Sequence, residues 1–152
     1  MNNRQKFVVF DIDGTISDPT HRMSFAFMKD WSMFNEKAYQ DPVIIKMADL
    51  MRELSRISNV MLLTGRNEKY RHITLKWLRD AELDFSFEEL IMRPDFDYRP
   101  DAEVKIELLE KRFGGKENVL NNIWFALEDR DQVVEEFRNY GLTVLQPTIG
   151  GY

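Results

Sequence analysis

The sequence predicts a three-layer α/β sandwich built on a mostly parallel central sheet. The chain has 152 residues, of which 43% are hydrophobic and 31% charged, which is enough for one domain with a packed core. Its apolar runs are short and mostly continuous, as is typical of strands that are covered on both faces. Helical patterns fill the stretches between these runs, and this alternation predicts right-handed crossovers between parallel strands.

Five apolar runs are interpreted as strands. Most of them lack the alternation of polar and apolar residues that a half-exposed strand shows, so we expect helices on both faces of the sheet. In chain order the runs are residues 7–10, 60–63, 89–92, 123–127 and 142–145.

Helices are expected between the strands. Asp41 followed by Pro42 has the form of an N-cap and a first helical residue, and apolar residues then recur at helical spacing up to Ile57. Similar apolar stripes run through residues 70–81, 104–113 and 133–140. Gly141 follows the last stripe directly and is expected to end that helix.

The segment from about residue 19 to residue 40 does not follow this alternation. Its most distinctive residues are His21, Arg22, Phe25, Phe27, Trp31 and Phe34. We expect a small helical insertion within a single domain of residues 1–152, with the aromatic side chains packing it onto the body. A platform on which nucleic-acid bases stack is the alternative interpretation of these aromatic residues.

Composition excludes several kinds of protein. The chain has no cysteine, which excludes disulfides, thiolate nucleophiles and Cys-ligated zinc, and two histidines are too few for a His-rich metal site. The formal net charge of -5 argues against a broad nucleic-acid-coating surface, but not against a ligand with a single phosphate. No apolar run approaches the ~20 residues needed to cross a bilayer, and the amino end has no signal-peptide pattern. We therefore expect a soluble, cytoplasmic protein with no membrane partner.

Chemically active side chains follow three of the predicted strands. The first strand leads into Asp11-Ile12-Asp13-Gly14-Thr15, the second into Thr64-Gly65-Arg66 and the fourth into Glu128-Asp129-Arg130. Ligands of open α/β sheets bind outside the carboxyl ends of the strands. Lys105 comes early in the helix after the third strand and can add a cation at the same edge.

This set of residues suits phosphoryl transfer. Asp11 is ionised at neutral pH and can act as a nucleophile without a base. Its charge repels a phosphate monoester, because two unit charges ~4 Å apart repel by roughly 4 kcal/mol at an effective dielectric of about 20. A divalent cation reverses that repulsion, and a donor set made only of oxygens suits Mg²⁺. Asp11 and Asp129 are the obvious side-chain ligands.

The other residues fit the same reaction. Thr64 can donate a hydrogen bond to a phosphoryl oxygen, and Lys105 can neutralise charge on the transferring group. Asp13 can donate a proton to the leaving alkoxide, and Gly14 lets the backbone approach the phosphate closely. The sequence therefore predicts a Mg²⁺-dependent phosphomonoester hydrolase.

The order of these motifs resembles the haloacid dehalogenase (HAD) superfamily of phosphotransferases. The matching residues are Asp11 to Thr15, Thr64, Lys105, Glu128 and Asp129. The resemblance implies a Rossmann-like, HAD-like fold with a minimal helical cap, an aspartyl-phosphate on Asp11, and general acid and then base work by Asp13. It also implies Mg²⁺ bound by Asp11, the backbone carbonyl of Asp13 and Asp129, with Glu128 bound directly or through water.

A closer resemblance is to the phosphatase half of viral and bacterial polynucleotide kinase-phosphatases, which removes 3′-phosphates from nucleic acid ends. It is carried by Arg22, Thr64-Gly65-Arg66, Trp77, Arg99-Pro100-Asp101, Lys105, residues 128–134 and the tail at residues 146–152. It implies that Arg22 and Arg66 contact the substrate, beside Gly14 and Gly65. Gly114-Gly115-Lys116-Glu117 lacks the first glycine and the Ser/Thr of a P-loop, so we expect a stand-alone phosphatase without a nucleotide cofactor.

Three alternative functions stay open. A (deoxy)nucleoside monophosphatase would use the same chemistry, because a small insertion admits either a nucleotide or a nucleic acid end. A non-enzymatic phospho-acceptor switch would use similar residues, although Asp13 acting as a base would shorten the life of its phosphoaspartate. A catalytically dead nucleic-acid-binding module is the third. The sequence leaves open the oligomeric state and any kinase partner on another chain.

Some residues near the predicted site have two interpretations. Asp101 either caps a helix after Pro100 or orients Lys105 or the active-site loop. Glu128 either binds metal or serves as a local cap or ion-pair partner. Structural or solvated roles are expected for Arg93, Arg99 and Arg130.

Overall fold

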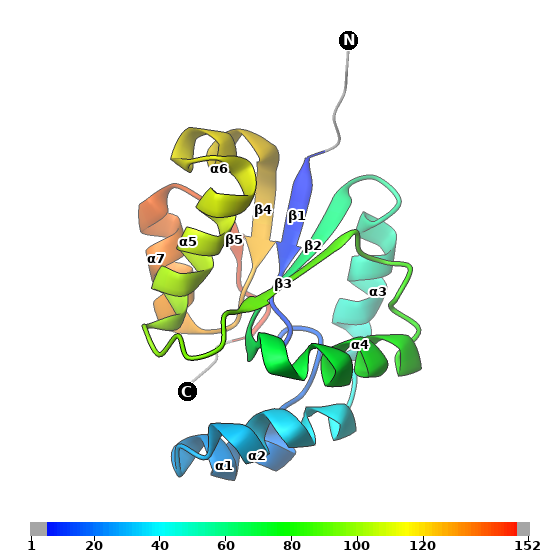
Figure 1. Cartoon of the computed structure of the whole chain (residues 1–152). Coiled ribbons are helices and arrows are strands. Elements are labelled where there is room, and N and C mark those ends of the chain that lie inside the picture. The colour runs from blue at the N-terminus through cyan, green and yellow to red at the C-terminus, as the bar shows by residue number, and fades with distance from the viewer. Residues whose placement is uncertain (1–5, 149–152) are drawn as a thin grey trace.

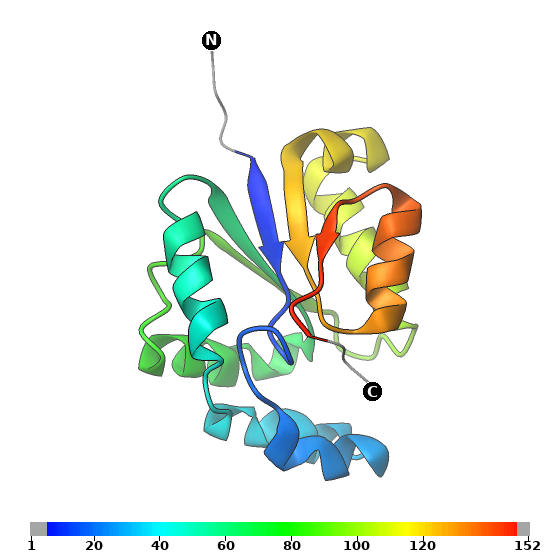
Figure 2. The same ribbon diagram turned by 180° about the vertical axis from the view of Figure 1, so that it is seen from behind.

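The protein is an α/β sandwich around a parallel sheet, which confirms the predicted fold class (Figures 1 and 2). The computed structural model describes residues 6–148, so the last four residues of the tail used in the resemblance lie outside the described residues. Across these residues the strand order is β3-β2-β1-β4-β5, and each neighbouring pair is parallel. The strands are β1 (Phe7–Phe10), β2 (Asn59–Asn67), β3 (Glu89–Arg93), β4 (Ile123–Leu127) and β5 (Val144–Leu145).

Two strands differ from the predicted bounds. β2 runs four residues beyond the predicted end, so that Thr64, Gly65 and Arg66 lie within the strand rather than after it. It pairs on both sides, with β1 and with β3, and its register against β3 shifts between Thr64 and Asn67. β5 is shorter than predicted because the Leu142 amide donates to the Phe137 carbonyl and ends a helix instead of joining the sheet.

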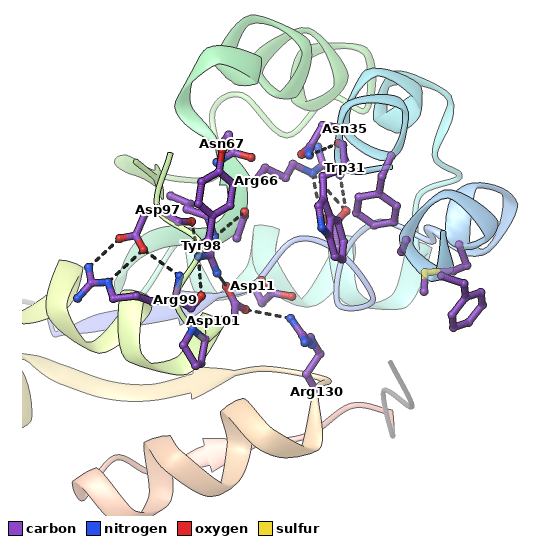
Figure 3. A pocket seen from close by; sticks show the side chains of 18 residues that line it. Asp11, Trp31, Asn35, Arg66, Asn67, Asp97, Tyr98, Arg99, Asp101 and Arg130 are labelled. Atoms are coloured by element: carbon purple, nitrogen blue, oxygen red, sulfur yellow. Dashed lines mark hydrogen bonds and ion pairs between the residues drawn. The ribbon is translucent and has the colours of Figure 1, made fainter. Parts of the chain in front are cut away.

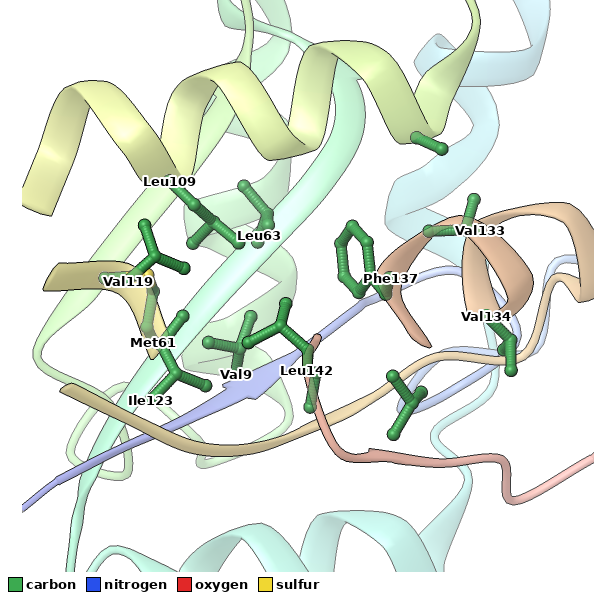
Figure 4. Close-up of a cluster of buried hydrophobic side chains, with 13 residues drawn as sticks. Val9, Met61, Leu63, Leu109, Val119, Ile123, Val133, Val134, Phe137 and Leu142 are labelled. Atoms are coloured by element: carbon green, nitrogen blue, oxygen red, sulfur yellow. The ribbon is translucent and has the colours of Figure 1, made fainter. Parts of the chain in front are cut away.

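The sheet has an apolar core on each face, which explains the continuous apolar runs. In β1, Val8 and Phe10 belong to one core cluster while Val9 belongs to the other, and β2 alternates in the same way. Figure 4 shows the cluster around Val9, where Leu109 and Phe137 come from helices on that face. Because both faces are buried, no residue of β1 needed to be polar.

Helices cover both faces of the sheet (Figures 1 and 2). On one face lie α3 (Ile45–Leu54) and α4 (Arg71–Asp80), and on the other lie α5 (Asp101–Phe113), α6 (Lys116–Asn122) and α7 (Asp131–Tyr140). Gly141 ends α7 with a φ of 114°, a left-handed conformation that glycine adopts without strain, as predicted. Within residues 6–148 no helix combines the length and the apolar character needed to cross a bilayer.

The predicted start of α3 is wrong. The helix begins at Ile45 with Ile44 as its N-cap residue, and Asp41 does not cap it. The Asp41 carboxylate is instead buried against the guanidinium groups of Arg22 and Arg66. Two buried cations outweigh the modest gain of a helix cap.

The segment after β1 folds into short helices beyond the carboxyl ends of the strands (Figure 1). They are α1 (Met23–Phe27) and α2 (Trp31–Glu36), flanked by 3-10 turns at Thr20–Arg22 and Lys37–Gln40. Phe34 is buried, but Phe27 and Trp31 are 73% and 52% exposed. The prediction that the aromatic group packs the insertion onto the body therefore holds for Phe34 and is wrong for Phe27 and Trp31.

Candidate active site

The carboxyl ends of β1 and β4 bring three acidic residues together. Phe10 pairs with Leu127, so the next residues, Asp11 on one strand and Glu128 and Asp129 on the other, leave the sheet at the same level. One carboxylate oxygen from each of the three lies within 4.8 Å of the others. All three residues are buried. The position of these residues after two predicted strands indicated that they would meet at one edge of the sheet.

Lys105 reaches the acidic residues from α5. Its Nζ lies 2.9 Å from Asp11 Oδ1 and 2.7 Å from Glu128 Oε2. It also lies 3.1 Å from Asp101 Oδ2. Burial opposes the charged amine, but the carboxylates of Asp101, Asp11 and Glu128 outweigh burial and raise the pKa of Lys105 well above its ordinary value. Lys105 is therefore a permanent cation beside Asp11.

Around Lys105 the acidic side chains outnumber the basic ones, so negative charge exceeds positive charge. Burial, followed by the charge of Glu128, raises the pKa of Asp11 well above its ordinary value, and the same two causes raise the pKa of Asp129 to about 7. Three carboxylate oxygens in a buried, negatively charged cluster suit a hard divalent cation. Such a cation would lower the pKa values of Asp11 and Asp129. Glu128 also accepts hydrogen bonds from the backbone amides of Asp129 and Arg130, so both of its sequence-based interpretations find support.

Asp13 lies apart from the three acidic residues and contacts two arginines. Arg66 Nε lies 3.1 Å from Asp13 Oδ2, Arg66 Nη2 lies 2.6 Å from Oδ1, and Arg22 Nη2 also donates to Oδ1. Burial raises the pKa of Asp13, but the charges of Arg66 and Arg22 outweigh it and hold the pKa well below its ordinary value. Ser17 donates a further hydrogen bond of 3.1 Å. The metal contact that the resemblance gives to the Asp13 backbone carbonyl stays a prediction.

Arg22 and Arg66 are fully enclosed, and Asp41 joins them. Arg22 Nε and Nη2 lie 2.7 Å and 2.6 Å from the two Asp41 oxygens, and Arg66 Nη2 lies 3.2 Å from Asp41 Oδ2. His21 also contacts Asp41, at 2.8 Å. The predicted substrate contacts of both arginines stay predictions, because their guanidinium groups face Asp13 and Asp41. Sequence reasoning missed Asp41, whose only signal was a pattern typical of a helix cap.

The remaining motif residues lie in the loop after β1 and near the end of β2. Gly14 has a φ of 81°, which favours glycine, and its amide donates to the Ser17 carbonyl. Thr64 is buried in β2, and its hydroxyl accepts a hydrogen bond from the Arg66 amide. Gly65 leaves no room for a side chain, because a Cβ there would lie 2.6 Å from Asp101 Oδ1.

Asp101 contacts Lys105 and is not the N-cap residue of α5. It is the first residue of that helix, and Pro100 occupies the N-cap position. Its oxygens lie 2.8 Å from Arg93 Nη2 and 3.4 Å from Arg130 Nη1, in addition to the contact with Lys105. Arg93 also donates to the backbone carbonyls of Asp97 and Arg99, which fits the structural role predicted for it.

A cavity of about 480 Å³ opens above these residues (Figure 3). Its lining includes Asp11, Asp13 and Arg66, residues of α1 and α2 on one side, and residues 97–101 with Arg130 on the other. The volume lies in the range of pockets that bind small molecules. A phosphate that entered this cavity would meet Asp11 directly.

Comparisons with known proteins agree with this geometry. The family described as "Polynucleotide kinase PNKP phosphatase domain" matches residues 5–152. A putative bifunctional polynucleotide kinase/RNA ligase of Autographa californica nuclear polyhedrosis virus is 25% identical over 134 residues, which is 87% of this chain. Those residues are only 18% of the viral protein.

Solved structures give the same result. Two structures of the Pnkp1/Rnl/Hen1 complex, one described as an RNA repair complex, contain a chain that is 27% identical, with TM-scores of 0.79 and 0.80. The match covers all of this chain and 45% and 49% of those chains, so this chain spans less than half of their length. A HAD-like hydrolase from Streptococcus pneumoniae shares the fold at 14% identity, with a TM-score of 0.65 over 95% of this chain and 85% of its own. The chain belongs to the family of polynucleotide kinase PNKP phosphatase domains and is a HAD-type phosphatase.

Proposed function

We propose that this protein is a Mg²⁺-dependent polynucleotide 3′-phosphatase that works through an aspartyl-phosphate on Asp11. The observation that carries the proposal is the convergence of Glu128, Asp129 and Lys105 on Asp11, which lines an open cavity together with Asp13. A nucleophile, an excess of oxygen donors and a second carboxylate in one place are what hydrolysis of a phosphate monoester requires.

Asp11, Asp129 and Glu128 would hold the cation. Their donor set contains only oxygen, which suits Mg²⁺ better than softer metals. When bound, Mg²⁺ would neutralise part of the charge on the phosphate and on the carboxylates around it. Within residues 6–148, this is the set of acidic side chains whose spacing fits a cation.

Asp11, Lys105 and Asp13 would each perform a different part of the reaction. Asp11 attacks phosphorus, the bond from phosphorus to the substrate oxygen breaks, and Lys105 stabilises the charge of the transferring group. Asp13 donates a proton to the departing alkoxide. It then takes a proton from the water that attacks the phosphoaspartate, which releases inorganic phosphate and restores Asp11.

The charges of Arg22 and Arg66 control the pKa of Asp13, and with it the ability of Asp13 to act as an acid. While Arg22 and Arg66 hold its pKa low, Asp13 is ionised and suited only to the base step. Its acid role requires the guanidinium groups to shift toward the incoming phosphate. That shift would also give Arg22 and Arg66 the substrate contacts that the resemblance implies.

A nucleic acid end is the substrate class best supported. The family description and the names of the similar proteins refer to polynucleotide kinase and RNA repair. The short helices α1 and α2 leave the cavity open, so that a chain attached to the phosphorylated nucleoside can extend into solvent. A separate nucleotide cofactor has no part in this reaction.

The test measures phosphate release with and without Mg²⁺ from 3′-phosphorylated oligonucleotides, 5′-phosphorylated oligonucleotides and mononucleotides. The 3′-phosphorylated oligonucleotide should be hydrolysed with the highest kcat/KM, and chelation of Mg²⁺ should abolish the activity. Asp11→Asn should remove turnover while the far-UV circular dichroism spectrum stays unchanged, because the amide keeps the shape and loses the nucleophile.

The rival functions give different results. A preference for mononucleotides would identify a nucleoside monophosphatase instead. Labelling by acetyl phosphate that persists for minutes would favour a phospho-acceptor switch, since Asp13 in the proposed role hydrolyses the phosphoaspartate. Binding of nucleic acid without any phosphate release would contradict an enzymatic role.

A further inference from the structure

The cavity above Asp11 has two chemically different parts. Its base is charged, whereas its outer walls carry aromatic side chains that are open to solvent. In Figure 3, Trp31 from α2 lies on one side and Tyr98, from the loop before α5, lies on the other, with Asp11 below and between them. Trp31 is 52% exposed and Tyr98 is 84% exposed. Neither exposed ring is explained by the packing of the core.

Trp31 packs against the insertion despite its exposure. Its ring packs edge-on against Phe34, with centroids 5.8 Å apart and an interplanar angle of 84°. Phe34 in turn lies 4.0 Å from the guanidinium carbon of Arg22, and Arg22 contacts Asp13. A chain of contacts therefore connects the Trp31 ring to Asp13.

A chain of contacts also holds the loop that carries Tyr98. Arg93 Nη1 donates to the carbonyls of Asp97 and Arg99, the residues on either side of Tyr98, at 3.0 Å and 2.9 Å. Arg93 Nη2 is bound to Asp101, which contacts Lys105. Both aromatic walls are thus joined by short chains of contacts to the residues that would bind the phosphate.

One acceptor atom in the same wall, Asn35 Oδ1, receives no hydrogen bond within the described residues. Asn35 is 5% exposed and lines the cavity, and its Nδ2 donates to the Trp31 carbonyl at 2.7 Å. Among the described residues, no group donates to its Oδ1, although that atom is buried. A buried acceptor without a donor is costly, and a ligand that carries an N–H or O–H group would satisfy it.

We propose that this cavity is a subsite for the base of the phosphorylated terminal nucleoside, which lies between Trp31 and Tyr98 while Asn35 Oδ1 accepts one of its hydrogen bonds. This inference rests on the proposed function and adds to it the part of the substrate that is recognised. A flat ring with polar edges matches two aromatic faces and one acceptor, and stacking on aromatic side chains accepts every base. The phosphate would then lie at the base of the cavity, at Asp11.

The experiment compares two substrates that differ only in that base. One is an oligonucleotide with a normal 3′-terminal nucleoside phosphate, and the other ends in an abasic deoxyribose 3′-phosphate. The wild type should show a KM about tenfold lower for the end that carries a base, because loss of one stacked base costs about tenfold or more in affinity. Both substrates should have similar kcat values.

Variants then locate the effect. In Trp31→Ala and in Tyr98→Ala, KM for the normal end should rise toward that of the abasic end, whereas Trp31→Phe should retain much of the difference. Phe85→Ala is the matched control, because Phe85 is an aromatic residue that is 94% exposed and does not line the cavity. This control should behave like the wild type.

The outcomes separate this inference from the proposed function. Equal KM values of the wild type for the two ends, or a persistent difference in Trp31→Ala and Tyr98→Ala, would overturn the base subsite and leave the 3′-phosphatase intact. An absence of phosphate release from both ends would contradict the proposed function itself. In that case quenching of tryptophan fluorescence by the two oligonucleotides, compared in wild type and Trp31→Phe, still tests whether a base binds beside Trp31.

Discussion

Asp101 shows how a single carboxylate can set the position of Lys105, the cation that we propose acts on the transferring phosphoryl group. Its Oδ1 accepts from Arg93, and its Oδ2 lies near Lys105 and Arg130. Burial raises the pKa of Asp101, but the charges of Lys105, Arg130 and Arg93 outweigh burial and lower it. The carboxylate therefore stays ionised and holds Lys105 beside Asp11. Gly65 is the neighbour that leaves room for it.

Replacing Gly65 by alanine should impair catalysis without unfolding the protein. The new Cβ would lie 2.6 Å from Asp101 Oδ1, a distance at which the carboxylate must move. Arg93 donates to the same Oδ1, and Lys105 contacts the other oxygen of this carboxylate, so the displacement should reach Lys105. We expect kcat/KM for phosphate release to fall by up to about 100-fold, as displacements of about 1 Å at active sites do.

A double-mutant cycle separates this mechanism from a general loss of packing. In an Asp101→Ala background the clash partner is absent, so Gly65→Ala should cost far less than it does in the wild type. An undiminished effect of Gly65→Ala in that background would show that the displaced group is not Asp101. Thermal unfolding of each variant serves to confirm that the chain remains folded.

At the scale of elements, Asp41 connects the insertion to the sheet. It follows the 3-10 turn Lys37–Gln40 and binds Arg22 from the start of the insertion and Arg66 from β2. Its backbone carbonyl accepts a hydrogen bond of 2.8 Å from Trp77 Nε1 on α4. The helices that form one cavity wall are therefore attached to the body through a buried ionic network.

Asp41→Asn should destabilise the protein strongly. The variant would leave two buried guanidinium groups with Asp13 as their main counter-charge, and breaking a buried ion pair from one side costs about 3–5 kcal/mol. We expect the free energy of unfolding, measured by urea denaturation, to fall by this amount.

Glu53→Gln provides the matched control for Asp41→Asn. It removes one charge from an exposed pair with Arg56 and should change the free energy of unfolding by less than about 1 kcal/mol. Similar losses in the two variants would mean that the Asp41 network contributes no more than a surface ion pair.

The role of Asp41 is also an example of what the sequence did not predict. The strands and the meeting of Asp11, Lys105 and Asp129 were predictable, because burial on both faces makes strands uniformly apolar and parallel strands end at one edge. The role of Asp41 was not, because its partners lie 19 and 25 residues away and a local pattern offered a helix cap instead. The exposure of Trp31 was missed for a related reason, since a cavity wall and a core face have the same spacing in sequence.

At the scale of the whole molecule, the proposed metal binding at the acidic cluster would be coupled to folding stability. The protein has an unfavourable concentration of negative charge where Asp11, Glu128 and Asp129 meet. The unfolded chain separates these charges, so the metal-free folded state is penalised wherever they are ionised. A cation that binds only the folded state would relieve the penalty and stabilise the fold.

Asp129 gives this coupling a defined pH range. Its pKa rises from 3.8 to about 7 on folding, so between these values the unfolded chain has released a proton that the folded protein keeps. The contribution of Asp129 to stability therefore becomes less favourable as pH rises from about 4 to about 7, and stays constant above that range.

Asp129→Asn should consequently stabilise the metal-free protein at neutral pH. With EDTA present, its Tm should exceed that of the wild type by more at about pH 7.5 than at about pH 5, because the amide removes a charge that is unfavourable only at the higher pH. Addition of Mg²⁺ at about pH 7.5 should raise the Tm of the wild type and raise that of Asp129→Asn much less, because the variant loses one ligand of the proposed site. Thermal unfolding followed by circular dichroism measures both effects. If Mg²⁺ stabilised the two proteins equally, Asp129 would not be a ligand; if the variant were less stable than the wild type at neutral pH in EDTA, the cluster would not carry the excess charge inferred from its burial.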